Sequence, residues 1–539
     1  MSTQVLRCAA LTRGPYPLLW EIRALAALWR SGLATPVAIF AAGDGFPGSA
    51  FERLCRRHAE RRANSLAPMV GGEQTLGLPV LSIRDWQTDA AGRAKLDFLI
   101  DFRGAGAPPP TTPRLGCWIL RLGAGATSSF QQSAVAAFCE TSPAIDVALV
   151  SRDAGGAERT LHTGRLRRRA GFAETLDAIL LNVTDWYELA CRKLLAGQAP
   201  PAAPTRPPAA STGPAAFAAA WLRGKARAFR ERHTIDIWNI GIAPRPSPEA
   251  LASGGRIDRV TWLPGAPDLT FRADPFGWLD AAGDMRIAHE RFDYRTGKGT
   301  LEVARLKGTP PAASFEVLAD LPVHTSYPFL VPVPGMLLCL PEVNETGRTL
   351  LFRIETEPLR FIHVATLLDD VPLSDGTIFR FGGHHWLFGT RADRDSQLRL
   401  YAWFARAVDG PWTAHALNPI KCDITSARPA GMPFRVGESL IRPAQDCSRS
   451  YGCAITLNRI LELTPTSFRE ETIGRIEPDP DGPYPDGIHT LSFVGGSVLI
   501  DGKRRVFRWN AAKLNETFIR RRQERRMRLH RNAGPGAAR

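Results

Sequence analysis

The pattern of apolar positions divides the chain into two parts with different periodicities. In the first part, short apolar runs that predict strands occur at 5–11, 35–43, 96–104 and 117–123. Amphipathic stretches with helical spacing occur between or after them, at 17–32 and 171–197. The first predicted helix is closed by Gly32, and the second is predicted to be one long helix. Strands that alternate with helices predict an α/β domain with a mainly parallel sheet.

The second part, from about residue 235 to 510, shows little helical periodicity. Short apolar runs recur there between clusters of turn residues, which is typical of an all-β closed or radial architecture. The region divides into five units of roughly 55 residues, near the span of a four-stranded propeller blade. Each unit opens with a related corner, at 272–276, 325–329, 373–379, 426–431 and 441–446. We therefore expect a five-bladed β-propeller.

A segment rich in Pro and Ala at 196–216 separates these two parts. Periodicity is lost there, so we expect a partly extended linker. The predicted organisation is an α/β domain at 1–195, the linker at 196–216, a connecting helix at 217–234, the propeller at 235–510 and a basic tail at 511–539.

A dinucleotide site in the first domain would need a glycine-rich turn after the first strand. The residues that follow this strand, LTRGPYP at 11–17, contain no GxGxxG. The sequence therefore does not support nucleotide binding in this domain.

Cysteine usage and hydropathy bear on the compartment. The 9 Cys are dispersed and form no CxxC pair, which is typical of reduced core thiols. The first residues lack the pattern of a signal peptide, and no apolar run is long enough to span a bilayer. We expect a cytoplasmic protein, with contact at the inner face of the membrane as a possible addition.

The net charge of +15 is concentrated near the C-terminus, where residues 518–539 hold eight Arg and one Glu. Such a tail is either a solvated helix end that frays, or a contact with an anionic membrane surface, or a nucleic-acid contact. Nucleic acid is the least favoured partner because Phe518 is the only aromatic residue in the segment.

Several motifs at the predicted corners are similar to those of a known family. They are ADPF at 273–276, HTSYPFL at 324–330, DGTIF at 375–379, SARPAG at 426–431, IRPAQDCSRSYG at 441–452 and GIHTL at 487–491. Over roughly 235–510 the chain resembles the propeller domain at the N-terminus of plant glucosamine inositolphosphorylceramide transferases and its bacterial relatives. This resemblance implies a five-bladed propeller similar to those of arabinanase- and xylosidase-type glycoside hydrolases.

In bacterial relatives such a propeller often follows a domain similar to the methionyl-tRNA formyltransferase fold. The resemblance implies the same Rossmann-type fold for 1–195. The run GCWILRLGAG at 116–125 has Leu and Arg where that family has a catalytic His. We therefore expect a degenerate scaffold that transfers no formyl group.

Glycoside hydrolases flank the scissile bond with two carboxyl groups, an acid and either a base or a nucleophile. The resemblance implies that Asp274 is one of them. The Asp of the second hydrolase blade is replaced here by Ser326-Tyr327-Pro328. The other carboxylates expected to face a central funnel are Glu290, Glu342, Asp375 and Asp446, although each alone could be a turn cap or a salt-bridge partner.

The expected substrate contacts are Arg428, Arg442, Gln445, His324, His489 and Tyr327. An Arg presents a planar fork that suits phosphate or carboxylate. Two Arg at corners taken to belong to adjacent blades suggest an anionic sugar, a sugar phosphate or a lipid-linked pyrophosphate. The alternative is that they form ion pairs with Asp375 or Asp446. No His, Cys and carboxylate set has metal-ligand spacing, so we expect no metal or cofactor; the resemblance leaves open a calcium ion on the propeller axis.

Three functions remain open. The first is a carbohydrate-active protein of cell-surface glycan or glycolipid biosynthesis, whose propeller binds a sugar and accompanies glycosyl transfer. The second is a propeller-type glycoside hydrolase with paired carboxylates. The third is a non-catalytic glycan-binding scaffold. The sequence after residue 235 lacks the strand–helix alternation of a nucleotide-sugar transferase domain, and the run PDPDG at 478–482 is a Pro-rich turn that is a poor substitute for that domain's DxD motif.

Overall fold

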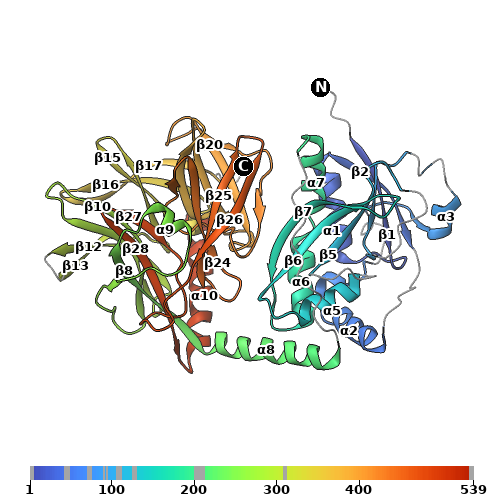
Figure 1. Cartoon of the computed structure of the whole chain (residues 1–539), viewed down its shortest axis with the longest axis horizontal. Helices are drawn as coiled ribbons and strands as arrows, with labels where there is room; N and C mark the ends of the chain where they lie inside the picture. The colour runs from blue at the N-terminus through green and yellow to red at the C-terminus, as the bar shows by residue number, and fades with distance from the viewer. Residues whose placement is uncertain are drawn as a thin grey trace. The chain divides into compact units, whose positions relative to one another are not determined.

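A computed structural model describes residues 5–41, 49–69, 76–88, 92, 95–104, 112–123, 130–198, 213–307 and 312–532. The chain forms two compact units, Met1–Ala228 and Phe229–Arg539 (Figure 1). Most of the linker predicted at 196–216 lies outside the described residues. The helix predicted at 217–234 is present as α8 (Pro214–Arg232).

The first unit is a seven-stranded sheet in the order β3-β2-β1-β4-β5-β6-β7. Five strands run parallel: β1 (Leu6–Thr12), β2 (Ala34–Ala41), β3 (Val80–Ser82), β4 (Phe98–Asp101) and β5 (Cys117–Leu122). Two antiparallel strands extend its edge, β6 (Ala144–Arg152) and β7 (Glu158–Arg167). The α/β architecture predicted for this part is therefore observed, with an antiparallel edge that the apolar pattern did not indicate.

Besides α8, the described residues of this unit form the helices α1 (Leu19–Ser31), α2 (Ala50–Glu60), α3 (Ile83–Thr88), α5 (Phe130–Cys139), α6 (Phe172–Asn182) and α7 (Trp186–Leu195). As predicted, α1 ends at Gly32, whose φ of 69° provides the left-handed C-cap. The prediction of one helix over 171–197 is wrong, because the chain forms two helices, α6 and α7, separated at 183–185. Buried faces on both helices continue the apolar period across the break, so the pattern did not reveal it.

The second unit is a five-bladed β-propeller. Its first three blades are the sheets β10-β11-β12-β13, β14-β15-β16-β17 and β18-β19-β20-β21, with β22 paired to β20. The fourth is β23-β24-β25-β26. The fifth, β27-β28-β8-β9, combines both ends of the unit, because β8 (Thr234–Pro244) pairs antiparallel with β28 (Ser497–Phe507) along its whole length. This pairing closes the ring and leaves no open seam between its first and last strands.

The strands of the first two blades are β10 (Thr270–Leu279), β11 (Met285–Asp293), β12 (Lys298–Lys307), β13 (Ala312–Ala319), β14 (Ser326–Val333), β15 (Met336–Glu342), β16 (Thr349–Thr356) and β17 (Leu359–Leu368). Those of the third and fourth are β18 (Leu373–Phe381), β19 (His384–Arg391), β20 (Arg399–Ala405), β21 (Thr413–Ala414), β22 (Lys421–Cys422), β23 (Phe434–Val436), β24 (Ser439–Asp446), β25 (Ala454–Leu463) and β26 (Phe468–Ile476). The fifth is completed by β9 (Thr261–Trp262) and β27 (Leu491–Val494). The propeller unit also contains two short helical segments, α9 (Pro248–Ala252) and η3 (Asn344–Thr346). A third short segment, η1 (Asn64–Leu66), lies in the first unit.

The predicted corners were correct for three blades and wrong for the last two. The runs at 272–276, 325–329 and 373–379 do open the first, second and third blades. The runs at 426–431 and 441–446 both belong to the fourth blade, where Pro429 bridges to Ala444 of β24. The fifth blade begins with β27 instead. The error arose from two similar Arg-Pro dipeptides, Arg428-Pro429 and Arg442-Pro443. Each suggested the start of a separate blade, but both lie in the fourth blade.

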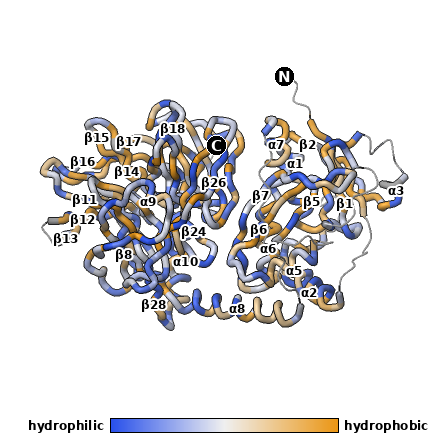
Figure 2. The backbone as a smooth tube through the Cα atoms, in the orientation of Figure 1, coloured by the Kyte–Doolittle hydropathy of each residue, from blue (hydrophilic) through white to orange (hydrophobic). Residues whose placement is uncertain are grey.

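Hydrophobic and hydrophilic positions alternate along the strands of the propeller unit (Figure 2), and buried apolar residues of neighbouring blades form shared clusters. One cluster joins the first three blades around Phe276, Phe329 and Leu387. A second cluster joins the fourth and fifth blades around Ile455 and Leu491. In the described ranges, no helix is both long and apolar enough to cross a membrane.

The basic tail begins with a helix, α10 (Ala511–Asn532), and residues 533–539 lie outside the described part of the chain. This helix packs on the propeller: Arg525 forms a two-pronged ion pair with Glu345, whose side chain is fully buried. Arg525 also donates to the carbonyl of Gly297. The basic segment is therefore partly built into the propeller unit.

Candidate functional site: a carboxylate pocket in the propeller

Three residues at the same position of the first three blades have a left-handed backbone. The φ angle is 56° at Asp274, 46° at Tyr327 and 52° at Asp375. At each position the first strand of the blade shifts register against its neighbour. A side-chain-bearing residue in this region costs of order 1–3 kcal/mol, so the surrounding fold holds it there. Asp274 and Asp375 both line a common pocket.

This central pocket is a cavity of about 340 Å³. Seven of the residues predicted from sequence line it: Asp274, Glu290, Glu342, Asp375, Arg428, His324 and His489. They come from all five blades or the segments joining them, so only closure of the ring brings them together. Ser326, Ser374, Tyr451 and Trp238 complete much of the wall.

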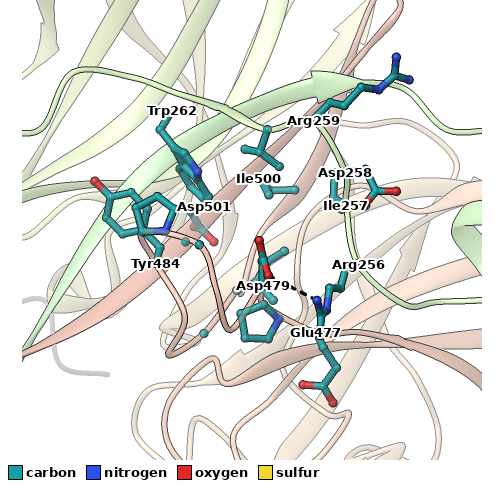
Figure 3. A pocket seen from close by; sticks show the side chains of 17 residues that line it. Arg256, Ile257, Asp258, Arg259, Trp262, Glu477, Asp479, Tyr484, Ile500 and Asp501 are labelled. Atoms are coloured by element: carbon teal, nitrogen blue, oxygen red, sulfur yellow. Dashed lines mark hydrogen bonds and ion pairs between the residues drawn. The ribbon is translucent and has the colours of Figure 1, made fainter.

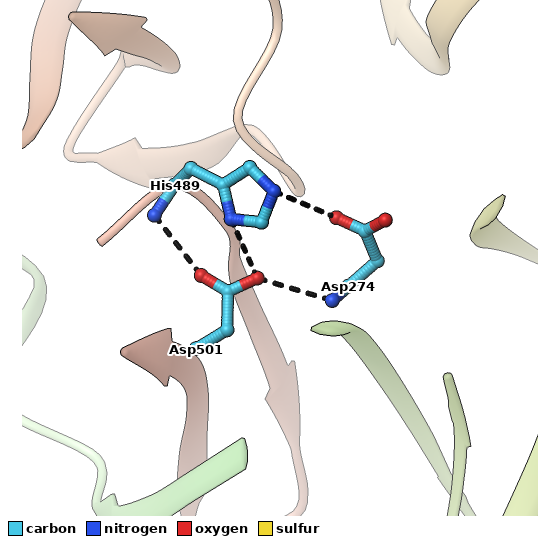
Figure 4. A group of neighbouring side chains, drawn as sticks. All are labelled: Asp274, His489 and Asp501. Carbon is cyan, nitrogen blue, oxygen red and sulfur yellow. Dashed lines mark hydrogen bonds and ion pairs between the residues drawn. The ribbon is translucent and has the colours of Figure 1, made fainter. Parts of the chain in front are cut away.

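On one side of the central pocket, His489 lies between two carboxylates (Figure 4). Its Nδ1 is 2.7 Å from Asp501 Oδ2, and its Nε2 is 3.4 Å from Asp274 Oδ1. Thr490 Oγ1 donates to Asp274 Oδ1 at 2.9 Å. The ring of His489 is also stacked on Trp238, with centroids 4.0 Å apart. The orientation of the imidazole is therefore fixed by contacts at both nitrogens and at its face.

On the other side, Arg428 is shared by two carboxylates. It donates to both oxygens of Asp375 and lies 3.5 Å from Glu342 Oε2. Asn344 Nδ2 donates to Glu342 Oε1, and the backbone N–H of Asp375 donates to Glu342 Oε2 at 3.3 Å. Arg428 thus takes part in an ion-pair network, the alternative that the sequence left open, while still lining the pocket.

Burial changes the protonation of these acids. It raises the pKa of Asp274 to about 6 and that of Glu342 to about 7, although His489 and Arg428 respectively act in the opposite direction. Burial and the neighbouring carboxyl groups raise the pKa of Glu290 well above its usual range. Near neutral pH the pocket therefore holds protonated carboxyl groups beside ionised ones, which is the condition for paired acid and base chemistry.

The same physics acts on the histidines in opposite ways. Burial alone would lower the pKa of His489, but the carboxylates of Asp501 and Asp274 outweigh it and raise this pKa. Burial lowers the pKa of His324 to about 3, with Arg522 and Arg525 adding to the effect. His489 therefore favours the charged imidazolium and His324 the neutral ring, whose Nδ1 accepts from the backbone N–H of Gly299 at 2.8 Å.

Helix α10 supplies part of the wall of the central pocket. Asn515, Phe518 and Arg522 line it. Arg522 donates to Asn344 Oδ1 at 2.8 Å, and Asn344 in turn donates to Glu342. A chain of hydrogen bonds therefore runs from the C-terminal helix to one of the pocket acids.

The run TGKG at 296–299, after β11, contains two glycines with different roles. A Cβ at Gly299 would come within 2.3 Å of Glu290 Oε1 and 2.7 Å of the carbonyl of Thr325. Gly297, with φ of 59°, serves the turn itself. The first glycine thus turns the chain and the second leaves room for a pocket carboxyl group.

Four predicted residues do not line the central pocket. Arg442 is buried in the fourth blade, where it pairs with Glu470. Asp446 pairs with Arg475. Gln445 lies behind the pocket and donates to Asp375, and Tyr327 is a core residue whose hydroxyl contacts Thr377 at 2.9 Å. Arg442 and Arg428 belong to one blade and point to different partners, so they do not form the two-arginine cradle expected from their motifs.

Asp501, Asn344, Glu345 and Arg522 were not anticipated. Asp501 lies in the middle of β28 and is fully buried, with Oδ1 accepting from the backbone N–H groups of His489 and Thr490 at 3.0 Å. An acid inside an otherwise apolar run, VLIDG, was the signal that could have marked it. Nothing in the sequence indicates that the tail arginines reach the second blade.

Among the residues described, Asp274, His489 and Asp501 have donor atoms within 4.8 Å of one another, close enough for a metal ion. However, both oxygens of Asp501 already accept backbone N–H groups, from His489, Thr490 and Asp274. These bonds anchor the side chain to the main chain. The contacts therefore fit an Asp–His–Asp ion-paired unit better than a metal cage.

Comparison with known proteins supports the resemblance of the propeller. Residues 264–478 match the family described as glucosamine inositolphosphorylceramide transferase 1, N-terminal. Glucosamine inositolphosphorylceramide transferase 1 of Oryza sativa subsp. japonica is 34% identical over 183 residues, covering 32% of this chain and 24% of that protein. The Arabidopsis thaliana protein is 33% identical over 179 residues, covering 31% of this chain and 23% of that protein. The chain thus aligns with about a quarter of the length of these relatives.

Solved structures give a weaker likeness. The family 117 glycoside hydrolase Zg3597 of Zobellia galactanivorans is 12% identical, with a TM-score of 0.31 over 51% of this chain and 91% of that chain. A thermostable family-43 glycoside hydrolase gives 11% identity and a TM-score of 0.29, over 39% of this chain and 77% of that one. The five-bladed architecture rests on the sheet topology of this chain and not on these overlaps.

Proposed function

We propose that the central pocket binds a sugar residue and that the protein is a carbohydrate-active protein of glycan or glycolipid assembly. The observation that carries the proposal is the gathering of Asp274, Glu290, Glu342 and Asp375 in one cavity of about 340 Å³. Carboxyl groups in mixed protonation states both donate to and accept from sugar hydroxyl groups. The similarity of residues 264–478 to the plant family supports a glycan or glycolipid as the substrate class.

The pocket supports acid–base chemistry on a glycosidic oxygen. Glu342, with a pKa of about 7, is the best placed proton donor near neutral pH. Asp375 accepts from Arg428 through both of its oxygens, which orients it as the partner base or charge stabiliser. His489 keeps Asp274 oriented through the 3.4 Å contact at Nε2. These roles suit either glycosyl transfer, which the similarity to a transferase family favours, or hydrolysis.

A direct test is calorimetric titration of the purified chain with methyl glycosides of glucose, galactose, mannose, glucosamine and N-acetylglucosamine. We expect at least one to bind, and Glu342→Gln and Asp375→Asn to weaken binding by about tenfold or more through loss of a charge-assisted hydrogen bond. Glu438→Gln, at an exposed position, is the matched control. Binding that is unchanged in both pocket variants would contradict the proposal.

Hydrolysis is the second candidate function, and the observation that favours it is the pair of raised carboxyl pKa values, about 6 at Asp274 and about 7 at Glu342. A panel of nitrophenyl glycosides would separate hydrolysis from glycosyl transfer. Release of nitrophenol that is lost in Glu342→Gln establishes a hydrolase. Turnover only with a nucleotide-sugar or lipid-linked donor establishes transfer, and binding without either leaves a glycan-binding scaffold.

We further propose that the unit before α8 is a formyltransferase-like scaffold that transfers no formyl group, and that the domains follow the boundaries 1–195 and 235–510. The parallel order β3-β2-β1-β4-β5 supports a Rossmann-type core.

We also propose that the exposed arginines of α10 contact an anionic membrane surface inside the cytoplasm. Ile519 and Met527, which are 54% and 51% exposed between those arginines, support this.

A further inference from the structure

A second cavity of about 280 Å³ lies in the propeller unit, between the outer parts of the fourth and fifth blades (Figure 3). We call it the lateral pocket. Its walls are the loop before β9, the segment that follows β26, and the middle of β28. Two backbone hydrogen bonds connect the chain just before the first of these walls to the second wall. Gly255 N–H donates to the carbonyl of Arg475, and Glu477 N–H donates to the carbonyl of Gly255, both at 2.8 Å. The walls of the pocket are therefore built into the fold.

One wall of the lateral pocket is an aromatic pair. The rings of Trp262 and Tyr484 lie 4.5 Å apart at an angle of 49°. Two glycines leave room for the indole, since a Cβ at Gly502 would come within 2.3 Å of it and one at Gly241 within 3.0 Å. Tyr484 is held by Asn239, whose Nδ2 donates to its hydroxyl oxygen at 2.9 Å. Because that oxygen accepts, the hydroxyl hydrogen remains available to donate.

The opposite wall carries charges of both signs. Arg256 and Asp479 face each other at 3.5 Å, each about half exposed, and Asp258, Arg259 and Glu477 lie beside them. The backbone of Arg259 is left-handed, with φ of 54°. Such strain is kept where the surrounding structure over-determines it, and it is concentrated at binding sites. Ile257, Ile488 and Ile500 form the apolar floor.

We infer that the lateral pocket binds a neutral saccharide residue, at a site separate from the central pocket. A pyranose has an apolar face of C–H groups that packs on an aromatic ring, and a rim of hydroxyl groups that donate and accept at once. The aromatic wall matches the first feature. The rim that includes Arg256, Asp258 and Asp479 matches the second, because each hydroxyl can accept from a guanidinium and donate to a carboxylate.

The charge balance argues against other small ligands. An anionic phosphate would face Asp258, Glu477 and Asp479, and an amine would face Arg256 and Arg259. Asp501 also borders this pocket, but its oxygens are engaged with backbone N–H groups and with His489, so it acts as part of the wall. That wall separates the lateral pocket from His489, which lines the central pocket. Saccharide binding in the lateral pocket requires no reaction in the central pocket.

The test is ligand-observed saturation-transfer NMR on the full chain with methyl glycosides of glucose, galactose, mannose and N-acetylglucosamine and with their disaccharides. Tyr484→Phe and Asp479→Asn each remove one polar contact and should weaken binding at the lateral pocket by about tenfold. Trp262→Ala should abolish it, while Trp262→Phe, which keeps an aromatic face, should retain most of it. Trp509→Ala, at a tryptophan 78% exposed and outside the pocket, is the control and should change nothing.

Glu342→Gln separates this site from the central one. We expect saturation transfer to remain in Glu342→Gln, and to be weakened about tenfold when Tyr484→Phe or Asp479→Asn is added to that variant, with circular dichroism unchanged in all of them. Binding that disappears in Glu342→Gln and is unaffected in the lateral variants would overturn the inference. So would the absence of saturation transfer to every saccharide of the panel at millimolar concentration.

Discussion

The imidazole of His489 and the carboxylate of Asp501 form a buried pair, with Nδ1 2.7 Å from Oδ2 and side chains only 3% and 0% exposed. Each shifts the titration of the other: the pKa of His489 is raised, and that of Asp501 is lowered because the charged imidazole outweighs burial. Both residues also contact Asp274 of the first blade: His489 Nε2 lies 3.4 Å from Asp274 Oδ1, and Asp501 Oδ2 accepts from the backbone N–H of Asp274 at 3.0 Å. The pair therefore links the fifth blade to the first.

The first prediction is that Asp501→Asn destabilises the propeller. The raised pKa of His489 gives stability that is complete below its unfolded value, about 6.5, and is lost as the pH rises through the folded value. The lowered pKa of Asp501 gives stability present above about 3.8 and lost as the pH falls through the folded value. We expect Asp501→Asn to lower the free energy of unfolding by about 3 kcal/mol near pH 6, since the buried imidazolium loses the nearer of its two carboxylates and keeps only Asp274, at 3.4 Å.

Urea unfolding between pH 4 and pH 9 measures this loss, and NMR titration of His489 measures its pKa. The exposed Asp481→Asn is the control. A variant with unchanged stability and an unchanged His489 pKa would show that the pair does not form.

The second prediction concerns the buried acid Glu342. Its pKa is raised from 4.5 to about 7, so the stability it contributes is complete below about pH 4.5 and falls as the pH rises through 7. Glu342→Gln cannot ionise and should escape this loss. At about 1.36 kcal/mol per unit, we expect the variant to be more stable relative to wild type at pH 8 than at pH 4.5 by up to about 3 kcal/mol. Glu438→Gln should show no such difference, and a parallel pH dependence of all three proteins would refute the assignment.

The third prediction tests how α10 is attached. Arg525 is the two-pronged partner of the fully buried Glu345. Arg525→Gln should lower the unfolding free energy by about 3 kcal/mol and increase hydrogen exchange across 511–532, because the Glu345 charge loses its main partner. Arg520→Gln is the matched control, since the Arg520 side chain is 68% exposed and its ion pair with Glu524 within the same helix is 3.8 Å long. Equal exchange in the two variants would show that Arg525 does not hold the helix.

The fourth prediction concerns helix α8 in the first unit. Glycine to alanine in a helix normally stabilises by about 1 kcal/mol. At Gly224, however, a Cβ would lie 2.1 Å from the carbonyl oxygen of Ala170. We expect Gly224→Ala to destabilise the first unit by about 2 kcal/mol, because the helix must move away from its neighbour. Thermal unfolding followed by circular dichroism measures this, with Gly155→Ala as the control; a rise in the melting temperature of Gly224→Ala would contradict the close approach.

The propeller was predictable because its signal is local and repeated. The corners at Asp274, Tyr327 and Asp375 recur at regular spacing, and all three have the same left-handed backbone at the start of a blade. The closure of the ring was not predictable, because β8 pairs with β28 across more than two hundred residues of sequence. Apolar alternation in a strand identifies the face it buries but not the strand beside it.

The candidate site was predictable in part for the same reason. Residues next to a corner motif, such as Asp274 and Asp375, follow the motif into the pocket. Arg442 carries a motif of the same form but lies in the second strand of its blade, where it meets Glu470. Asp501 reaches His489 and Asp274 through the closing strand, and Arg522 reaches the pocket through the C-terminal helix, so no local pattern marks them.

Sugar binding in the central pocket is tested most directly by a crystal structure of the Glu342→Gln variant soaked with a glycoside that binds the wild-type chain. We expect a sugar ring in the central pocket, with hydroxyl or glycosidic oxygens within hydrogen-bonding distance of residue 342 and of Asp274 or Asp375. An empty central pocket, with the sugar bound only elsewhere on the molecule, would contradict it.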